Sequence, residues 1–143
     1  MSKSDTFENE LLRLIFNGTA IANIADNTAT APLSQLFLAL HTADPGEAGL
    51  QSTSEIAYTG YARVAVNRTA GGWTITASSV SPTANIEFAE MTGGVGGTAT
   101  FASIGVASTG ATKILYRGAL TPTIVTSVGV IPRIKTTSTI TED

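Results

Sequence analysis

From residue 33 to the C-terminus, short apolar and β-branched runs alternate with turn-forming residues, and this pattern restricts the fold more than any other feature of the sequence. The turn signals recur about every 8–12 residues, a spacing typical of antiparallel sandwiches and barrels rather than of βαβ units. Leu36–Leu40 predicts a strand buried on both faces, and Asp44-Pro45-Gly46 predicts the turn after it. We predict seven or eight strands in an antiparallel β-sandwich of jelly-roll-like form.

Further strands are predicted from apolar alternation and β-branched residues in the rest of the chain. The predicted runs are residues 62–66, 73–76, 86–88, 98–107, 113–120, 123–127 and 131–139. Between them lie predicted loops, of which Glu47–Thr59 is a long surface loop and Gly93–Gly97 is the most flexible. Pro122 and Pro132 are expected at strand starts or on edge strands, because proline cannot donate to a β ladder.

One helix is predicted before the strands. Asp5 and Glu8 have the spacing of a capping box, and apolar residues follow at helical spacing, so we predict a helix over Asp5–Phe16. Asn17-Gly18 is a typical left-handed helix stop. A further short turn of helix is predicted at residues 20–25.

The length of the chain, 143 residues, suits one domain with one hydrophobic core. We predict a single domain of residues 1–143, with an N-terminal helical segment at 5–25 and the β-sandwich at 33–143. The fold class is therefore mainly β, with one N-terminal α-helix. Cysteine is absent, so disulfides are excluded and packing must supply the stability.

Charged residues make up 13% of the chain, and the net charge is −3. The eight basic residues are scattered, so the sequence offers no positive stripe for phosphates and we expect no nucleic-acid partner. No run of about 18 apolar residues occurs, so we expect no membrane partner. The polar N-terminus lacks the apolar core of a signal peptide, and we expect a protein made and used in water.

The residues that could perform catalysis do not form a known motif. His41 is the single histidine; a Ser-His-Asp arrangement is formally open to it, but no Gly-x-Ser-x-Gly elbow is present and we interpret it as a structural residue. Glu87 and Glu90 are interpreted as residues of an exposed strand face rather than a glycosidase pair. Gly93–Gly97 lacks the Lys-Ser or Lys-Thr of a phosphate-binding loop. We expect no catalytic residues and no enzyme activity.

Three carboxylates, Asp44, Glu47 and Glu55, lie in one predicted loop, and oxygen clusters of this kind bind calcium. Their spacing fits no known calcium loop. An ordinary solvated loop is therefore favoured, and we predict neither a metal site nor a bound cofactor.

Aromatic residues gather between residues 58 and 73, where Tyr58, Tyr61 and Trp73 lie near Arg63 and Arg68. Such clusters are enriched at protein interfaces, but interior packing explains them about equally well, and carbohydrate stacking is a minor alternative. The helix carries more apolar residues than one sheet face needs, so it is either buried on two sides or contacts a partner chain. The candidate interaction surface comprises Phe7, Leu11, Leu12, Phe16, Tyr58, Tyr61, Arg63 and Trp73.

Strand edges and the chain end offer further contacts. Edge strands near Pro122 and Pro132 can add a strand from a neighbour, since an unpaired edge invites pairing. Residues 139–143 could exchange onto another subunit. Arg133 and Lys135 share one predicted strand face and suit the rim of an interface.

Four stretches carry a resemblance that composition alone does not give. They are Phe7–Phe16 (FENELLRLIF), Leu38–Gly46 (LALHTADPG), Tyr58–Arg63 (YTGYAR) and Thr139–Asp143 (TITED). Together they resemble a widespread family of tailed-phage virion proteins, commonly labelled tail fibre proteins. The chain also resembles the cement, or head-decoration, protein of a Bordetella podophage. Neither resemblance brings catalytic residues with it.

The resemblance implies a non-enzymatic structural protein of the virion, made in the cytoplasm of a bacterial host. As a cement protein it would form a dimer or trimer with itself, bind the major capsid protein on the exterior of the head, and clamp neighbouring capsid subunits. The alternative is a tail-fibre or receptor-binding adaptor module, in which Tyr58, Tyr61 and Trp73 would contact a host glycan or protein.

Overall fold

The N-terminal helix α1 (Asp5–Asn17) starts at the predicted residue but is capped one position earlier. In the computed structural model, which describes residues 3–21, 24–25 and 32–142, Ser4 is the N-cap, and its hydroxyl accepts a hydrogen bond from the backbone N–H of Phe7. The capping box expected at Asp5 and Glu8 is therefore wrong. Both carboxylates lie in the first turn, where the helix dipole makes a negative charge favourable.

The helix ends as the sequence predicts, but its last carbonyls are satisfied from a distant segment. Gly18 adopts a left-handed conformation with φ of 66°, and its N–H donates to the carbonyl of Arg13. The last turn contains no basic residue of its own. Arg68 supplies the charge instead, because its Nε donates to the carbonyl of Ile15 at 2.6 Å and its Nη2 donates to that of Leu14 at 2.7 Å.

After the helix, Ile21 and Ala25 are joined by two backbone hydrogen bonds. The N–H of Ala25 donates to the carbonyl of Ile21 at 2.8 Å, and the N–H of Ile21 donates to the carbonyl of Ala25 at 3.0 Å. This reciprocal pair is an antiparallel bridge, but the bond from Ala25 to Ile21 also has the spacing of a helical turn, so the turn predicted at 20–25 stays a prediction. Residues 22 and 23 of that prediction lie outside the described residues.

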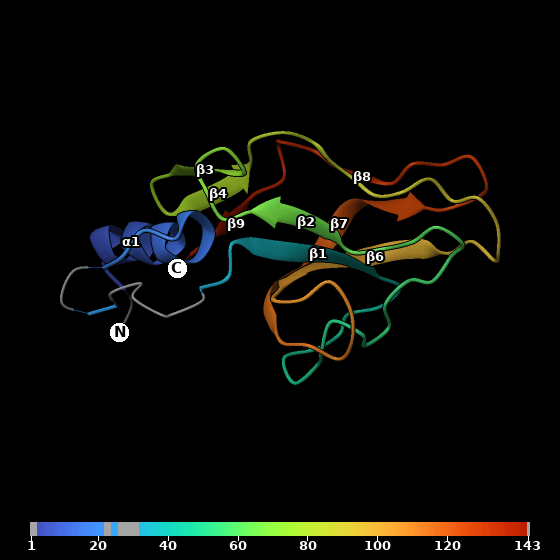
Figure 1. Cartoon of the computed structure of the whole chain (residues 1–143), viewed down its shortest axis with the longest axis horizontal. Helices are drawn as coiled ribbons and strands as arrows, with labels where there is room; N and C mark the ends of the chain where they lie inside the picture. The colour runs from blue at the N-terminus through green and yellow to red at the C-terminus, as the bar shows by residue number, and fades with distance from the viewer. Residues whose placement is uncertain (1–2, 22–23, 26–31, 143) are drawn as a thin grey trace. The chain divides into compact units, whose positions relative to one another are not determined.

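The chain divides into two compact units, drawn together in Figure 1. Unit 1 comprises residues 1–35, 67–85 and 135–143, and unit 2 comprises residues 36–66 and 86–134. Unit 1 therefore joins the helix to two later segments that the sequence pattern assigned to the sandwich. The single domain of residues 1–143 stays a prediction.

Unit 1 packs α1 against a small antiparallel sheet. Its strands are β3 (Trp73–Thr76), β4 (Ser79–Pro82) and β9 (Ile140–Thr141), in the order β3-β4-β9. The core contains Leu12, Phe16, Trp73 and Val80, all buried. The rings of Phe16 and Trp73 meet edge to face, with centroids 4.8 Å apart. The apolar face of the helix therefore has to be wide enough to bury both Leu12 and Phe16 in this core.

Unit 2 contains a four-stranded antiparallel sheet and a two-stranded one. The larger sheet has the order β2-β1-β6-β7, and the smaller pairs β5 with β8. The strands are β1 (Gln35–His41), β2 (Val64–Asn67), β5 (Ile86–Glu87), β6 (Thr98–Gly105), β7 (Ile114–Val125) and β8 (Arg133–Ile134). Gln35 and Asn67, at strand ends, are grouped with unit 1. In β1, Leu36 and the run 38–41 are buried, which confirms the predicted strand with two covered faces.

Three strand predictions differ from the structure. The runs predicted at 113–120 and 123–127 belong to one strand, β7, on the edge of the sheet; its register with β6 is interrupted between Ala119 and Ile124, the stretch that contains Pro122. The run at 131–139 contains only the short β8. Strands β4 and β9 were not predicted, since Ser, Pro and Thr dominate them.

The predicted fold class is confirmed: the chain is mainly β, with antiparallel sheets and one N-terminal helix. The turn at Asp44-Pro45-Gly46 is also confirmed, since the Asp44 carboxylate accepts from the N–H of Gly46, which has φ of 75°. The jelly-roll form of the sandwich stays a prediction.

Candidate functional site

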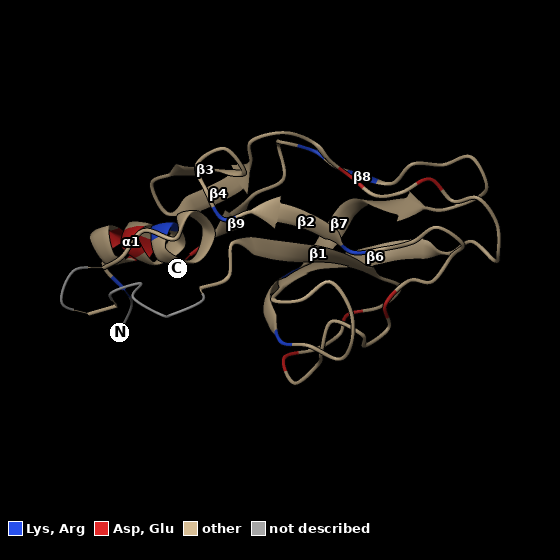
Figure 2. Cartoon of the chain, in the orientation of Figure 1, with Lys and Arg blue, Asp and Glu red and all other residues tan. Residues whose placement is uncertain are grey.

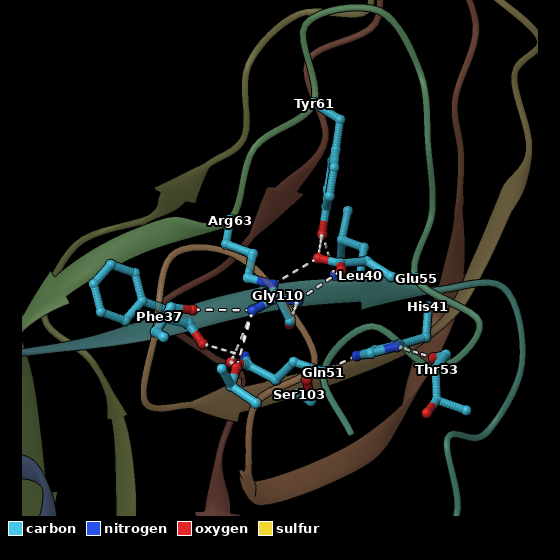
Figure 3. Close-up of polar contacts among 12 residues, drawn as sticks. Phe37, Leu40, His41, Gln51, Thr53, Glu55, Tyr61, Arg63, Ser103 and Gly110 are labelled. Atoms are coloured by element: carbon cyan, nitrogen blue, oxygen red, sulfur yellow. Dashed lines mark hydrogen bonds and ion pairs between the residues drawn. The ribbon is translucent and has the colours of Figure 1, made fainter. Parts of the chain in front are cut away.

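A cluster of polar side chains lies in unit 2 beside the strand β1, and it contains His41, Glu55 and Arg63, which the sequence analysis considered. Figure 3 shows that they come from the end of β1, from the segment after it and from β6. Two of its members, His41 and Gln51, have no exposed surface, and Arg63 is nearly as buried. A buried polar group is costly unless it is hydrogen-bonded, so the partners of each group decide what the cluster does.

Arg63 lies at the centre of this network, and its guanidinium is surrounded by acceptors. Nε and Nη2 donate to the two carboxylate oxygens of Glu55, each at 2.8 Å. Nη2 also donates to the carbonyl of Gly110 at 2.8 Å, and Nη1 donates to the carbonyl of Ala107 and the hydroxyl of Thr112, each at 3.1 Å. The bond to Glu55 raises the pKa of Arg63 more than burial lowers it. One side chain therefore fastens two loops to each other.

Tyr61 connects this ion pair to the sheet. Its hydroxyl donates to Oε1 of Glu55 at 3.0 Å and accepts from the backbone N–H of Leu40 at 3.0 Å (Figure 3). Burial raises the pKa of Tyr61 well above its ordinary value. Because the phenol stays protonated, it keeps both hydrogen bonds and holds the loop on the end of β1.

Gln51 fills the space above a glycine of β6. Its Nε2 donates to the carbonyl of Phe37 at 2.9 Å, and its Oε1 accepts from the hydroxyl of Thr112 at 3.0 Å. A Cβ on Gly105 would come within 2.1 Å of the Gln51 side chain. The glycine is therefore required for close approach, not for backbone freedom.

His41 and Ser103 form a second buried pair on neighbouring strands. The ring atom Nδ1 lies 2.8 Å from the carbonyl of Thr53, and Nε2 lies 2.7 Å from the hydroxyl of Ser103. A carbonyl only accepts, so Nδ1 carries the proton and Nε2 accepts from Ser103 when the ring is neutral. Burial is the main cause that lowers the pKa of His41 and favours this neutral form.

This order of groups, a serine hydroxyl on a histidine held by an acceptor, is that of a nucleophile and its base. A substrate would have to reach the serine oxygen. His41 is 0% exposed and Ser103 is 2% exposed, and both lie between paired strands β1 and β6. The pair therefore joins β1, β6 and the loop at Thr53, and we interpret it as structural.

The carboxylates considered for calcium do not gather. Asp44 accepts two hydrogen bonds from Arg117, at 2.7 and 2.8 Å, while Glu55 is paired with Arg63. Glu87 likewise pairs with Arg133. Among the described residues, no three His, Cys, Asp or Glu side chains are close enough to hold a metal ion together.

The eight residues of the predicted interaction surface are divided between the two units. In unit 1, Leu12, Phe16 and Trp73 are buried, and Phe7 and Leu11 are half-buried. In unit 2, Tyr58 and Arg63 are buried and Tyr61 is half-buried. Five of the eight are therefore buried, as expected for interior packing, the alternative that the sequence left open. A contact role for the remaining three stays a prediction.

Sequence reasoning missed Gln51, Ser103 and Thr112 altogether, and it considered Glu55 only as a metal ligand. No local signal marks them, because each acts through partners far away in the chain. Arg63 beside two tyrosines was the one available hint. In a chain with so few charges, an Arg next to a predicted strand needs a carboxylate partner.

Comparison with known protein families identifies the family of this chain. The family described as "Podophage GP4 fiber I protein gp80" matches residues 2–141. The chain belongs to this family. It is therefore a structural protein of a bacteriophage virion, as the resemblance implied. None of the curated proteins matches the chain closely enough to count as a relative.

The match to the podophage fiber I family includes residues of both units of this virion component. The match therefore covers α1 and the buried polar network alike. Among the described residues of this family member, no helix is long and apolar enough to cross a membrane.

Proposed function

We propose that the chain is a capsid cement, or head-decoration, protein that binds the outside of the phage head and clamps neighbouring major capsid subunits. The observation that carries the proposal is the inward-facing polar network of unit 2. Its His, Arg and Glu side chains, the groups suited to chemistry, are used to fix loops onto the sheet. Loops fixed in advance lose little conformational entropy when they bind a surface. A preformed scaffold of this kind supports a binding role rather than a catalytic one.

The mechanism is thermodynamic linkage. A protein that binds only the assembled shell stabilises that shell by mass action, since each bound copy lowers the free energy of the assembled form. Neighbouring copies bridge the same capsid subunits, so many modest contacts make loss of the whole layer rare. Cement binding therefore needs no strong individual site, and neither a cofactor nor a metal enters it.

A tail-fibre or adaptor role is the second candidate, favoured by the family description, which names a fiber protein. The aromatic grip considered from the sequence gives it little support. Tyr58 and Trp73 are both buried, so neither ring is displayed to a glycan. A fibre component would bind through another part of the chain.

The number of copies in purified virions separates the two candidates. We expect quantitative mass spectrometry, with the major capsid protein as internal standard, to find one copy per capsid subunit or a simple fraction of that number. A count of only a few to a few dozen copies per virion would overturn the cement proposal and support the tail. Treatment that releases the outer head layer should also release this chain together with it.

A further inference from the structure

One end of unit 2 carries exposed apolar side chains and no charge. Residues 91–112 and 118–132 contain no Asp, Glu, Lys or Arg. Within them, Val95 is 88% exposed, Val125 64%, Val128 67% and Ile131 47%. We call these four residues the neutral end. Figure 2 shows the loop after β7 without a charged residue, whereas the loop before β6 carries one, Glu90, ahead of the uncharged run that begins at residue 91.

The neutral end is held in place by hydrogen bonds between its two loops. The hydroxyl of Thr126 donates to the carbonyl of Gly97 and accepts from its N–H, at 3.0 and 2.9 Å. The N–H of Met91 donates to the carbonyl of Val130, and the N–H of Gly129 donates to the carbonyl of Met91. A Cβ on Gly96 would come within 2.0 Å of the carbonyl of Thr126, so the loops approach as closely as glycine allows.

Fixed loops that display valine and isoleucine to water are a sign of an interface. Isolated exposed apolar residues are ordinary, but three of them on two loops tied together, with a fourth at the adjoining end of β7, form a patch. Gly97, the last residue of the segment predicted to be the most flexible, is bonded to Thr126, and the flexibility of Gly93–Gly97 stays a prediction. The display is therefore built into the fold.

The sheet edge beside this patch is open to pairing. Strand β7 is the last strand in the order β2-β1-β6-β7, and its final residue, Val125, belongs to the neutral end. The second half of β7, residues 118–125, is uncharged and largely exposed. An edge strand presents backbone donors and acceptors that only another extended strand satisfies together.

We propose that the neutral end and the adjoining edge of β7 form the contact surface between two copies of this chain. An antiparallel pair of identical strands is self-complementary about a two-fold axis. Charge favours the same pairing, because the net charge of −3 would repel copies at most surfaces, while two neutral ends meet without like-charge repulsion. The inference goes beyond the proposed function and holds for a head or a tail component.

The test is the oligomeric state of the purified full chain, measured by sedimentation velocity across a concentration series. We expect a reversible dimer for the native chain. Val128→Glu and Ile131→Glu should each raise the dissociation constant of the dimer by at least about tenfold, because two equal charges would face each other across the axis. A native chain that stays monomeric throughout the series would overturn the proposal.

Leu33→Glu is the matched control. Leu33 is 46% exposed, like Ile131, but it belongs to unit 1. We expect this variant to dimerise as the native chain does, and circular dichroism should show all three variants folded. Equal loss of dimer in Leu33→Glu and Ile131→Glu would refute the assignment to the neutral end.

Hydrogen exchange tests the strand edge separately. In the dimer, backbone amides of residues 118–125 should exchange more slowly than in a diluted, monomeric sample, with amides of β1 unchanged. Exchange in β7 that does not depend on concentration would rule out strand pairing. Both measurements use the isolated protein, so their failure is distinct from a copy number that contradicts the cement role.

Discussion

Glu55 and Arg63 are joined by two parallel hydrogen bonds of 2.8 Å, in the bidentate geometry of a carboxylate on a guanidinium. The side chain of Arg63 is only 2% exposed and that of Glu55 is 17% exposed. Two carbonyls and a hydroxyl from residues 107–112 occupy the remaining donors of Arg63. The pair therefore ties the loop after β1 to the loop between β6 and β7.

We expect Arg63→Met to lower the free energy of unfolding by about 3–5 kcal/mol, because it leaves a half-buried carboxylate and two carbonyls without their donor. Urea denaturation followed by circular dichroism measures the change. The control is Arg117→Met, which breaks the more exposed pair with Asp44 and should cost about 0–1 kcal/mol. Equal losses in the two variants would contradict the central role of Arg63.

The stability of the chain should fall as the pH drops below the ordinary pKa of histidine, 6.5. Burial lowers the pKa of His41 in the folded chain, so the unfolded chain binds a proton that the folded chain does not. The free energy of unfolding should therefore be highest above pH 6.5 and decrease by up to about 1.4 kcal/mol per pH unit below it. The decrease ends at the lowered pKa.

Denaturation curves at half-unit steps between pH 5 and 8 measure this slope. Since His41 is the only histidine, His41→Gln should be less stable at pH 8 but should show a flatter curve between pH 5.5 and 7. An unchanged slope in the variant would assign the pH dependence to carboxylates instead.

Gly105→Ala should destabilise unit 2 by about 1–3 kcal/mol, because the new methyl group would displace Gln51 and break its bonds to Phe37 and Thr112. Gly118→Ala is the control on the neighbouring strand. No atom lies within 4 Å of its Cβ, and it should change stability by less than about 0.5 kcal/mol. Thermal melts of both variants decide between overpacking and a general effect of alanine.

Leu12→Ala should cost about 2–5 kcal/mol, whereas Leu11→Ala, at a half-buried position, should cost less than about 1 kcal/mol. Trp73 is the only tryptophan and lies in the same core as Leu12, so its fluorescence reports unfolding of unit 1 directly. Equal losses of stability in the two variants would contradict the difference in burial between Leu12 and Leu11. Assembly defects in Leu12 variants would reflect folding, while those in Leu11 variants would test a contact.

Local rules predicted the elements that depend on local interactions. The helix and its stop at Gly18, the strand of β1 and the turn at Asp44 all follow from residues within a few positions of each other. The same rules misplaced the N-cap, because Ser4 and Asp5 are both good caps and only the backbone conformation of Ser4 distinguishes them. They divided β7 at Pro122, where the register with β6 is interrupted but the strand continues, because a single strand does not show whether it resumes pairing beyond a proline.

The amino-acid sequence alone is enough to predict a mainly β virion protein with one helix, no cysteine and few charges. Periodicity and turn chemistry carry that information, and both are local. The packed fold is needed to see that Arg63 pairs with Glu55, that Arg68 bonds to the end of α1, and that the neutral end stays exposed. These outcomes depend on contacts between residues distant in the chain, and an uncharged valine has the same local pattern whether it is buried or exposed.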